Sequence, residues 1–156
     1  MRVRGTARKD IEKWRALAPD CELFIRESMF KAADYFDPPT GVPCYDDFMK
    51  LRFARGEAYA CMDDQDNWLG AIAILKNEQR IALLAVANNA DFDGVAMALI
   101  DRAMKAFGGQ RKAVVHVIVT GNARICGYAK ILGAHGFRAI GDGYENGVQI
   151  RLFETE

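Results

Sequence analysis

The chain has 156 residues, of which 51% are hydrophobic, and its 21 basic and 21 acidic side chains give a formal net charge of zero. This length and apolar fraction predict one domain, residues 1–156, that buries a sizeable core without a disulfide or metal staple. The balanced charge offers no electrostatic attraction to nucleic acid or to an anionic membrane, so neither is an expected partner.

Targeting and metal-binding signals are not expected in this sequence. Residues 1–5 carry charges without a following apolar stretch, which argues against a signal peptide, and no run of about 18 apolar residues predicts a transmembrane helix. The cysteines lie far apart without C-x-x-C spacing, at Cys21, Cys44, Cys61 and Cys126. We therefore expect reduced thiols in a cytoplasmic protein, and no metal site.

The N-terminal third predicts a short strand and two helices. The strand falls at 1–6, the first helix at about 7–18, and a second helix, whose apolar face is ragged, at about 20–36. The Pro-rich segment 37–43 must be a loop, because proline disrupts both helices and central strands. A further helical turn is expected at 46–51.

The pattern then becomes extended. Three strand-like segments, 57–62, 68–75 and 81–87, are separated by short polar turns, which predicts an antiparallel meander. A polar turn at 88–93 leads from the last of these strands into a helix that opens with Gly94. A strand, a Gly-containing turn and a helix N-terminus together form a phosphate-binding device, because the first N–H groups of a helix lack partners within it.

The C-terminal part completes a mixed sheet. Residues 113–119 are apolar on both faces, which predicts a central strand parallel to 81–87. A helix begins near Asn122, and strands follow at 138–140 and 148–153. The order β-α-α-β-β-β-α-β-α-β-β predicts a mixed α/β fold, with a mostly antiparallel sheet, a central β-α-β crossover and helices on both faces.

These features together resemble the GNAT superfamily of N-acetyltransferases, over residues 2–153 and best over 57–137. The family places a turn of the form Arg/Gln-x-x-Gly-x-Gly/Ala after a strand that ends in Val, and an Asn…Tyr…Gly-Phe segment further along. The matching positions are Val86 at the strand end, Gly94, Val95 and Ala96 in the turn, and later Asn122, Tyr128, Gly136 and Phe137.

The resemblance implies that an amine attacks the thioester of acetyl-CoA directly. Backbone groups of Leu84, Ala85 and Val86 would pair with the pantetheine arm and polarise the thioester carbonyl. Tyr128 would protonate the leaving thiolate, and Asn122 would contact the pantetheine, cap its own helix, or do both. Backbone N–H groups would bind the pyrophosphate from Phe92, Asp93, Gly94, Val95 and Ala96.

Two positions depart from the family pattern. Asp91 takes the place of Arg or Gln, and Asp93 follows it, although carboxylates repel a pyrophosphate; capping of the helix is the favoured role of either residue. Tyr128 follows Asn122 by six residues instead of seven, a difference of about 100° of helix rotation. Tyr128 also shares an apolar face with Leu132, so a core tyrosine is an equal alternative.

The acceptor would be a small-molecule or protein amine. Its pocket would lie under the loop at 37–47, lined by Tyr35, Phe36, Tyr45 and Trp68. No general base is assigned: His116 is interpreted as a core histidine, and the carboxylates of Glu57, Glu78, Asp63, Asp64 and Asp66 are interpreted as solvated.

Two other functions stay open at this point. One is a non-catalytic interaction or regulatory module of the same fold, whose CoA site Asp91 and Asp93 have eroded. The other is transfer of a different acyl group from its CoA thioester. A homodimer is compatible with either.

Overall fold

A computed structural model describes residues 1–17, 21–24, 45–87, 89–108, 113–118, 124–145 and 148–155 of the chain. Its α-helices are α1 (Ile11–Leu17), α2 (Tyr45–Ala54), α3 (Phe92–Phe107) and α4 (Arg124–Ala134), with single 3-10 turns at η1 (Arg8–Asp10) and η4 (Lys76–Glu78). Its strands are β1 (Arg2–Gly5), β2 (Cys21–Phe24), β3 (Ala58–Met62), β4 (Trp68–Leu75), β5 (Arg80–Val86), β6 (Val114–Ile118), β7 (Phe137–Glu145) and β8 (Val148–Thr155). Within these residues, no helix has the length and apolar character needed to cross a membrane.

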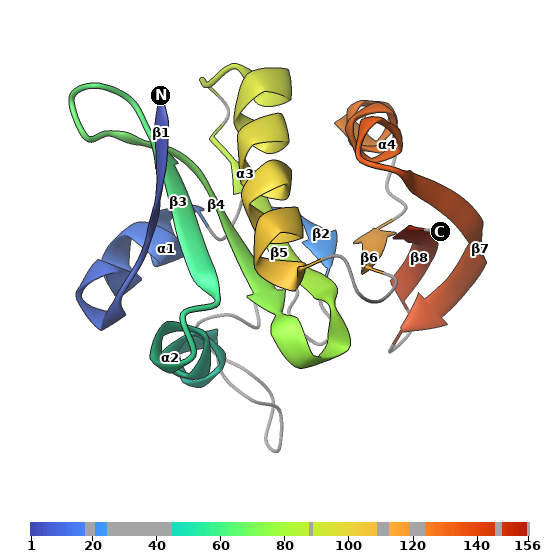
Figure 1. Cartoon of the computed structure of the whole chain (residues 1–156), viewed down its shortest axis with the longest axis horizontal. Helices are drawn as coiled ribbons and strands as arrows, with labels where there is room; N and C mark the ends of the chain where they lie inside the picture. The colour runs from blue at the N-terminus through green and yellow to red at the C-terminus, as the bar shows by residue number, and fades with distance from the viewer. Residues whose placement is uncertain are drawn as a thin grey trace.

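One mixed sheet organises the molecule. Among the described residues eight strands pair in the order β1-β3-β4-β5-β2-β6-β8-β7 (Figure 1). The strand pairs are antiparallel except β5 and β6, which run parallel through Arg80–Val114 and Ile81–Val115. The predicted meander, here β3-β4-β5, and the predicted β5-α3-β6 crossover are therefore confirmed.

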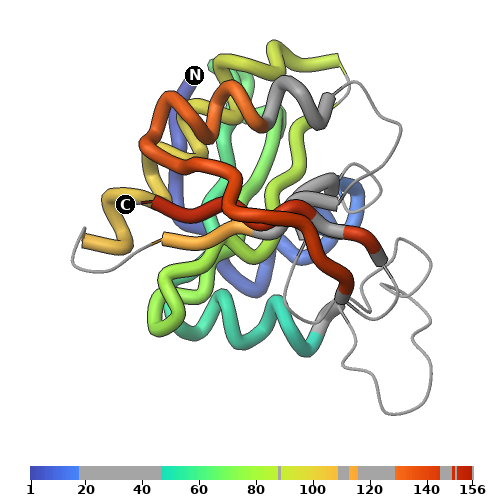
Figure 2. The backbone as a smooth tube through the Cα atoms, turned by 90° about the vertical axis from the view of Figure 1, so that its right-hand side faces the viewer, coloured from blue at the N-terminus to red at the C-terminus, as the bar shows by residue number. Residues whose placement is uncertain are grey.

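Helices cover both faces of the sheet, as predicted. Leu99 of α3 and Ile131 of α4 join a buried cluster that includes Ile72 of β4. On the opposite face, Trp14 of α1 and Met49 of α2 pack against the small side chains of β3, β4 and β5. Figure 1 shows α3 in front of the sheet, and Figure 2 looks onto the end of the sheet where α4 and the β7–β8 hairpin lie.

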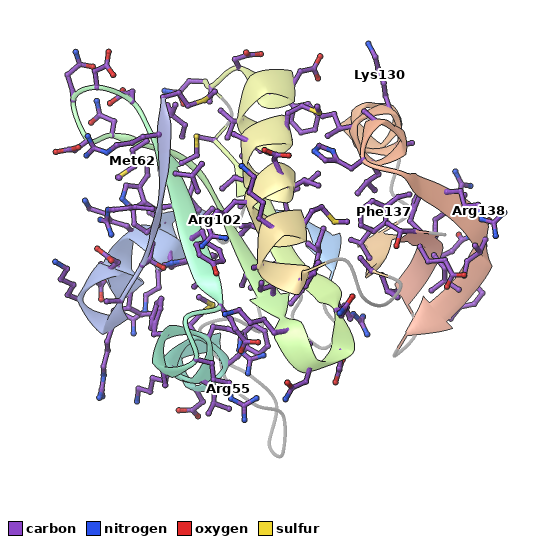
Figure 3. The ribbon with its side chains drawn as sticks, viewed as in Figure 1. Arg55, Met62, Arg102, Lys130, Phe137 and Arg138 are labelled. Carbon is purple, nitrogen blue, oxygen red and sulfur yellow. The ribbon has the colours of Figure 1, made fainter. Side chains whose placement is uncertain are left out.

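The helix α4 has one polar face and one apolar face. Lys130 points away from the sheet, whereas Phe137, at the start of β7, points inward beneath the helix (Figure 3). Ile131 and Leu132 are buried against the same core as Phe137. Burial of this stripe holds α4 on the same face of the sheet as α3.

The helix predicted at about 20–36 is wrong for its first residues. Cys21–Phe24 form the strand β2, which pairs antiparallel with β5 on one side and with β6 on the other. Pairing on both edges satisfies the backbone of this segment without a helix, so tertiary contacts override the local pattern. The rest of that helix and the Pro-rich loop lie outside the described residues.

Gly70 of β4 lets α3 approach the sheet closely. A Cβ built at this position would lie 2.7 Å from the carbonyl oxygen of Ala85 and 2.8 Å from Cγ1 of Val95. Because the first contact is with backbone, the neighbouring strand would have to move to make room. Gly70 therefore helps to set where α3 begins relative to the end of β5.

We expect Gly70→Ala to lower the free energy of unfolding by about 1–3 kcal/mol, the usual cost of overpacking a core. Gly133→Ala is the matched control, because the Cβ position at Gly133 in α4 is open and alanine favours a helix by up to about 1 kcal/mol. Urea denaturation of both variants would measure the difference. Equal stability of the two variants would show that the close approach of α3 is not a constraint.

Candidate functional site

The site is built around the separation of β5 and β6. The two strands pair directly at Arg80–Val114 and Ile81–Val115, and no further along within the described residues. The register between β5 and β4 also shifts here, since Ile74 opposes Ile81 whereas Ala73 opposes Leu83. Such a bulge bends a strand and strengthens its twist, which accounts for the divergence of β5 from β6.

The strand β2 lies in the gap that this divergence creates. Leu23 is opposite Leu84 of β5 on one side and opposite Val117 of β6 on the other, and Cys21 is opposite Ala85. Adjacent strands lie about 4.8 Å apart, so the gap is one strand wide. The backbone edge assigned to a pantetheine arm is therefore occupied by the chain itself in this arrangement.

The three residues predicted to hold the pantetheine all belong to this part of β5. Leu84, Ala85 and Val86 are fully or almost fully buried, and their other edge pairs with β4. An extended amide chain fits between β5 and β6 only with β2 displaced, and the pantetheine-binding role of these residues stays a prediction.

Asp91 occupies the N-cap position of α3, as the capping hypothesis expects, but its carboxylate makes no capping hydrogen bond. The carboxylate lies over Gly94 instead, where a Cβ would come within 2.5 Å of Oδ2 of Asp91. A negative charge is thereby held at the positive end of the helix dipole. This is the region to which the resemblance assigns the pyrophosphate.

The residues predicted as pyrophosphate donors divide into two groups. Val95 and Ala96 are core residues, and the N–H of Val95 donates to the carbonyl oxygen of Asp91 at 3.0 Å, inside the helix. The N–H of Val95 is thus already used within α3. Phe92, Asp93 and Gly94 form the first turn, and their pyrophosphate-binding role stays a prediction.

The structure does not place the predicted acid chemistry. Tyr128 belongs to α4, but its side chain is outside the described part of the chain, as is Asn122 altogether. Position 128 lies one helical turn from Leu132, which is fully buried. Both interpretations of Tyr128 therefore stay open, and so does the role of Asn122.

Trp68 is the predicted acceptor-pocket residue whose side chain the structure describes. Its ring meets that of Trp14 edge-on at 6.2 Å, and Nζ of Lys13 lies 5.7 Å from its centroid. A pocket of about 250 Å³ lies beside it, lined by Lys13, Ala16, Leu17, Asp66, Asn67 and Trp68. The neighbouring Leu69 accepts a hydrogen bond from Ala87, just past β5, so the pocket lies at the end of the sheet where α3 begins, but on the face that α1 covers.

The interpretation of Glu57 as a solvated residue is wrong. Its side chain is buried, lies 3.5 Å from Nε of Arg52 and accepts a hydrogen bond of 2.6 Å from the N–H of Lys76. These partners come from other segments, so the local pattern did not reveal them. Because Lys76 follows β4, this buried ion pair lies at the opposite end of the sheet from α3's first turn and cannot act as a base there.

Asp63 lies at the same end as the pocket but is poorly suited to accept a proton. The N–H groups of Asn67 and Gln65 donate to its carboxylate at 2.9 Å each. These bonds, with that from Asn67 the stronger influence, lower the pKa of Asp63. A carboxylate with a lowered pKa is a weaker general base.

No cluster of His, Cys, Asp or Glu suited to a metal ion occurs among the residues that the structure describes. Burial raises the pKa of the Cys61 thiol, so this cysteine is not activated as a nucleophile. The described residues thus offer backbone groups and a pocket beside Trp68 as the features of the site.

No protein-family model and no curated protein sequence matches this chain. Solved structures do match it. A polyamine N-acetyltransferase of Drosophila melanogaster that forms N-acetylagmatine has a TM-score of 0.66 at 8% identity, with 99% of each chain covered. A GNAT-family acetyltransferase of Streptococcus agalactiae has a TM-score of 0.62 at 14% identity, with 99% of this chain and 94% of that chain covered. yncA of Salmonella typhimurium, solved with acetyl-CoA, has a TM-score of 0.65 at 9% identity, with 99% and 92% covered.

The charge of Asp91 should weaken any anion bound at the start of α3. We expect Asp91→Gln to tighten binding of CoA and acetyl-CoA by roughly two- to fivefold, since one charge at a helix terminus is worth about 0.3–1 kcal/mol. Thermal-shift titrations with both ligands would measure this. Asp47→Gln, at a 70% exposed side chain of α2, controls for the change in net charge.

A ligand-induced shift in the Asp91→Gln variant no larger than that of the wild type would contradict this expectation. It would mean that the carboxylate of Asp91 does not oppose an anion at the start of α3.

Proposed function

We propose that this chain, whose fold is that of the GNAT N-acetyltransferases, transfers the acetyl group of acetyl-CoA to an amine. The observation that carries the proposal is the one-strand gap between β5 and β6. The gap adjoins the end of β5, from which the chain leads directly to the N-terminus of α3. A pantetheine arm is an extended chain with two amide groups, so a strand position in a sheet suits it.

The proposed reaction needs two contributions from the protein, stabilisation of charge on the carbonyl oxygen and a proton for the leaving thiolate. The amine nitrogen forms a bond to the thioester carbonyl carbon, and the carbon–sulfur bond breaks. Backbone N–H groups of Leu84 to Val86 would stabilise the negative charge that develops on the carbonyl oxygen, a contribution of roughly 3 kcal/mol per donor. Tyr128 would give its proton to the leaving thiolate, the proton lost by the amine would pass to water, and Tyr128 would regain a proton from water.

A polyamine is the acceptor class that we propose. The Drosophila neighbour is a polyamine N-acetyltransferase, and the turn between β3 and β4 brings three carboxylates to the pocket end of this sheet, at Asp63, Asp64 and Asp66. Asp64 is 93% exposed and Asp66 is among the residues that line the pocket. Because Asp66 pairs with Arg2 and Asp64 lies 3.9 Å from the N-terminal amine, a cationic polyamine would bind here by replacing these cations at the carboxylates.

A second function is favoured by what occupies the predicted cofactor site. β2 occupies the gap and the carboxylate of Asp91 lies over the start of α3, so the chain itself fills both parts of the predicted cofactor site. An interaction module that has lost acetyl transfer would keep such an arrangement permanently. The two functions differ in whether acetyl-CoA binds.

We expect calorimetry to show saturable binding of acetyl-CoA, and mass spectrometry to show acetylation of agmatine or spermidine. Tyr128→Phe should lower kcat roughly a hundredfold while leaving acetyl-CoA affinity unchanged, the pattern of a lost general acid. Tyr144→Phe is the matched control, because Tyr144 is 73% exposed on β7.

Absence of binding at millimolar acetyl-CoA, both in the wild type and in a variant with β2 weakened, would reject the acetyltransferase and leave the interaction module. Binding of acetyl-CoA together with full activity in Tyr128→Phe would reject the role of Tyr128 alone.

A further inference from the structure

The position of β2 bears on how acetyl-CoA could bind, and the inference drawn from it rests on the proposed function. We propose that β2 is an internal competitor for acetyl-CoA, so that the cofactor binds only when Cys21–Phe24 leave the gap between β5 and β6. The site is then self-inhibited, and its opening is a step separate from the chemistry.

The competition follows from the register of the strands. Leu23 lies directly between Leu84 and Val117, and Phe24 is opposite His116. The β5 positions that β2 covers, Leu84 and Ala85, are two of the three assigned to the pantetheine. A peptide strand and a pantetheine arm each fill one strand position, so a gap of that width holds one of them at a time.

β2 is also built so that it can leave. It has four residues, and its register against β5 breaks between Cys21 and Leu23. The sheet stays connected without it, because β5 and β6 pair directly at Arg80–Val114 and Ile81–Val115. By contrast, the other edge of β5 pairs with β4 at six positions. Loss of β2 therefore opens the gap while the rest of the sheet stays paired.

At the start of α3, the chain also places one of its own groups where the cofactor would bind. The carboxylate of Asp91, lying over Gly94, provides a negative charge where the pyrophosphate would bind. The chain thus supplies both a strand and an anion where the ligand has an extended arm and a phosphate. A site that is open in about a tenth of the molecules binds its ligand about tenfold more weakly than an open site.

A reversible lock tests the competition. Cys21 and Ala85 are directly opposed in an antiparallel pair, where Cα atoms lie about 4.5–5.5 Å apart, within reach of a disulfide. Ala85→Cys oxidised with diamide should therefore tie β2 to β5, as peptide mass spectrometry would verify. We expect acetyl-CoA affinity, measured by calorimetry, to fall at least tenfold on oxidation and to recover with dithiothreitol.

The double variant Cys21→Ser/Ala85→Cys is the control, because it cannot form this bond and its affinity should not respond to oxidation. Equal affinity of the cross-linked and reduced forms of Ala85→Cys would overturn the proposal, since β2 would then be fixed in the gap without excluding the cofactor.

Weakening β2 should have the opposite effect. Leu23→Pro removes a backbone donor from the strand, and we expect its affinity for acetyl-CoA to rise about tenfold over that of Leu23→Val, which keeps the donor. Affinity unchanged in Leu23→Pro, beside clear binding to the wild type, would overturn the competition and leave the proposed function standing. If none of the three proteins, the wild type, reduced Ala85→Cys and Leu23→Pro, bound acetyl-CoA, both the competition and the proposed function would be overturned.

Discussion

A central β-strand has to pair its peptide groups on both edges, because unpaired groups in the interior cost the full penalty of their desolvation. β5 meets this requirement with β4 along one edge, but along the other edge β6 moves away after Ile81. Something extended and rich in amide groups must take the vacant strand position. In this arrangement it is β2, and in an acetyltransferase at work it would be the cofactor. The proposed function depends on which of the two takes this position.

The carboxylate of Asp91 and the strand β2 differ in how strongly they oppose the cofactor. The carboxylate of Asp91 stands on an exposed helix start, where a charge is worth less than about 1 kcal/mol, so Asp91 can tune affinity but cannot block it. β2 pairs with the backbone edge of β5, and no ligand can pair with the same peptide groups at the same time. A permanently paired β2 therefore distinguishes an interaction module from an enzyme more sharply than the carboxylate of Asp91 does.

The local sequence pattern alone predicts some of the elements correctly. The apolar run at 68–75, bounded by polar turns, predicts a strand, and the helical stripe that leads to Phe107 predicts a helix; both are present. β2 was missed because its partners, Leu84 and Val117, are distant in sequence and its own pattern was that of a ragged helix. That raggedness was the available signal. The burial of Glu57 was missed because its partners belong to other elements, Arg52 to α2 and Lys76 to the turn after β4.

The central claim is that the cofactor takes the place of β2. Hydrogen–deuterium exchange of the wild-type chain tests it directly, by following the amides of residues 21–24 with and without saturating acetyl-CoA. Displacement predicts that these amides lose protection when the ligand binds, while those of β4 keep theirs. Unchanged or increased protection of residues 21–24 in the bound state would contradict the account.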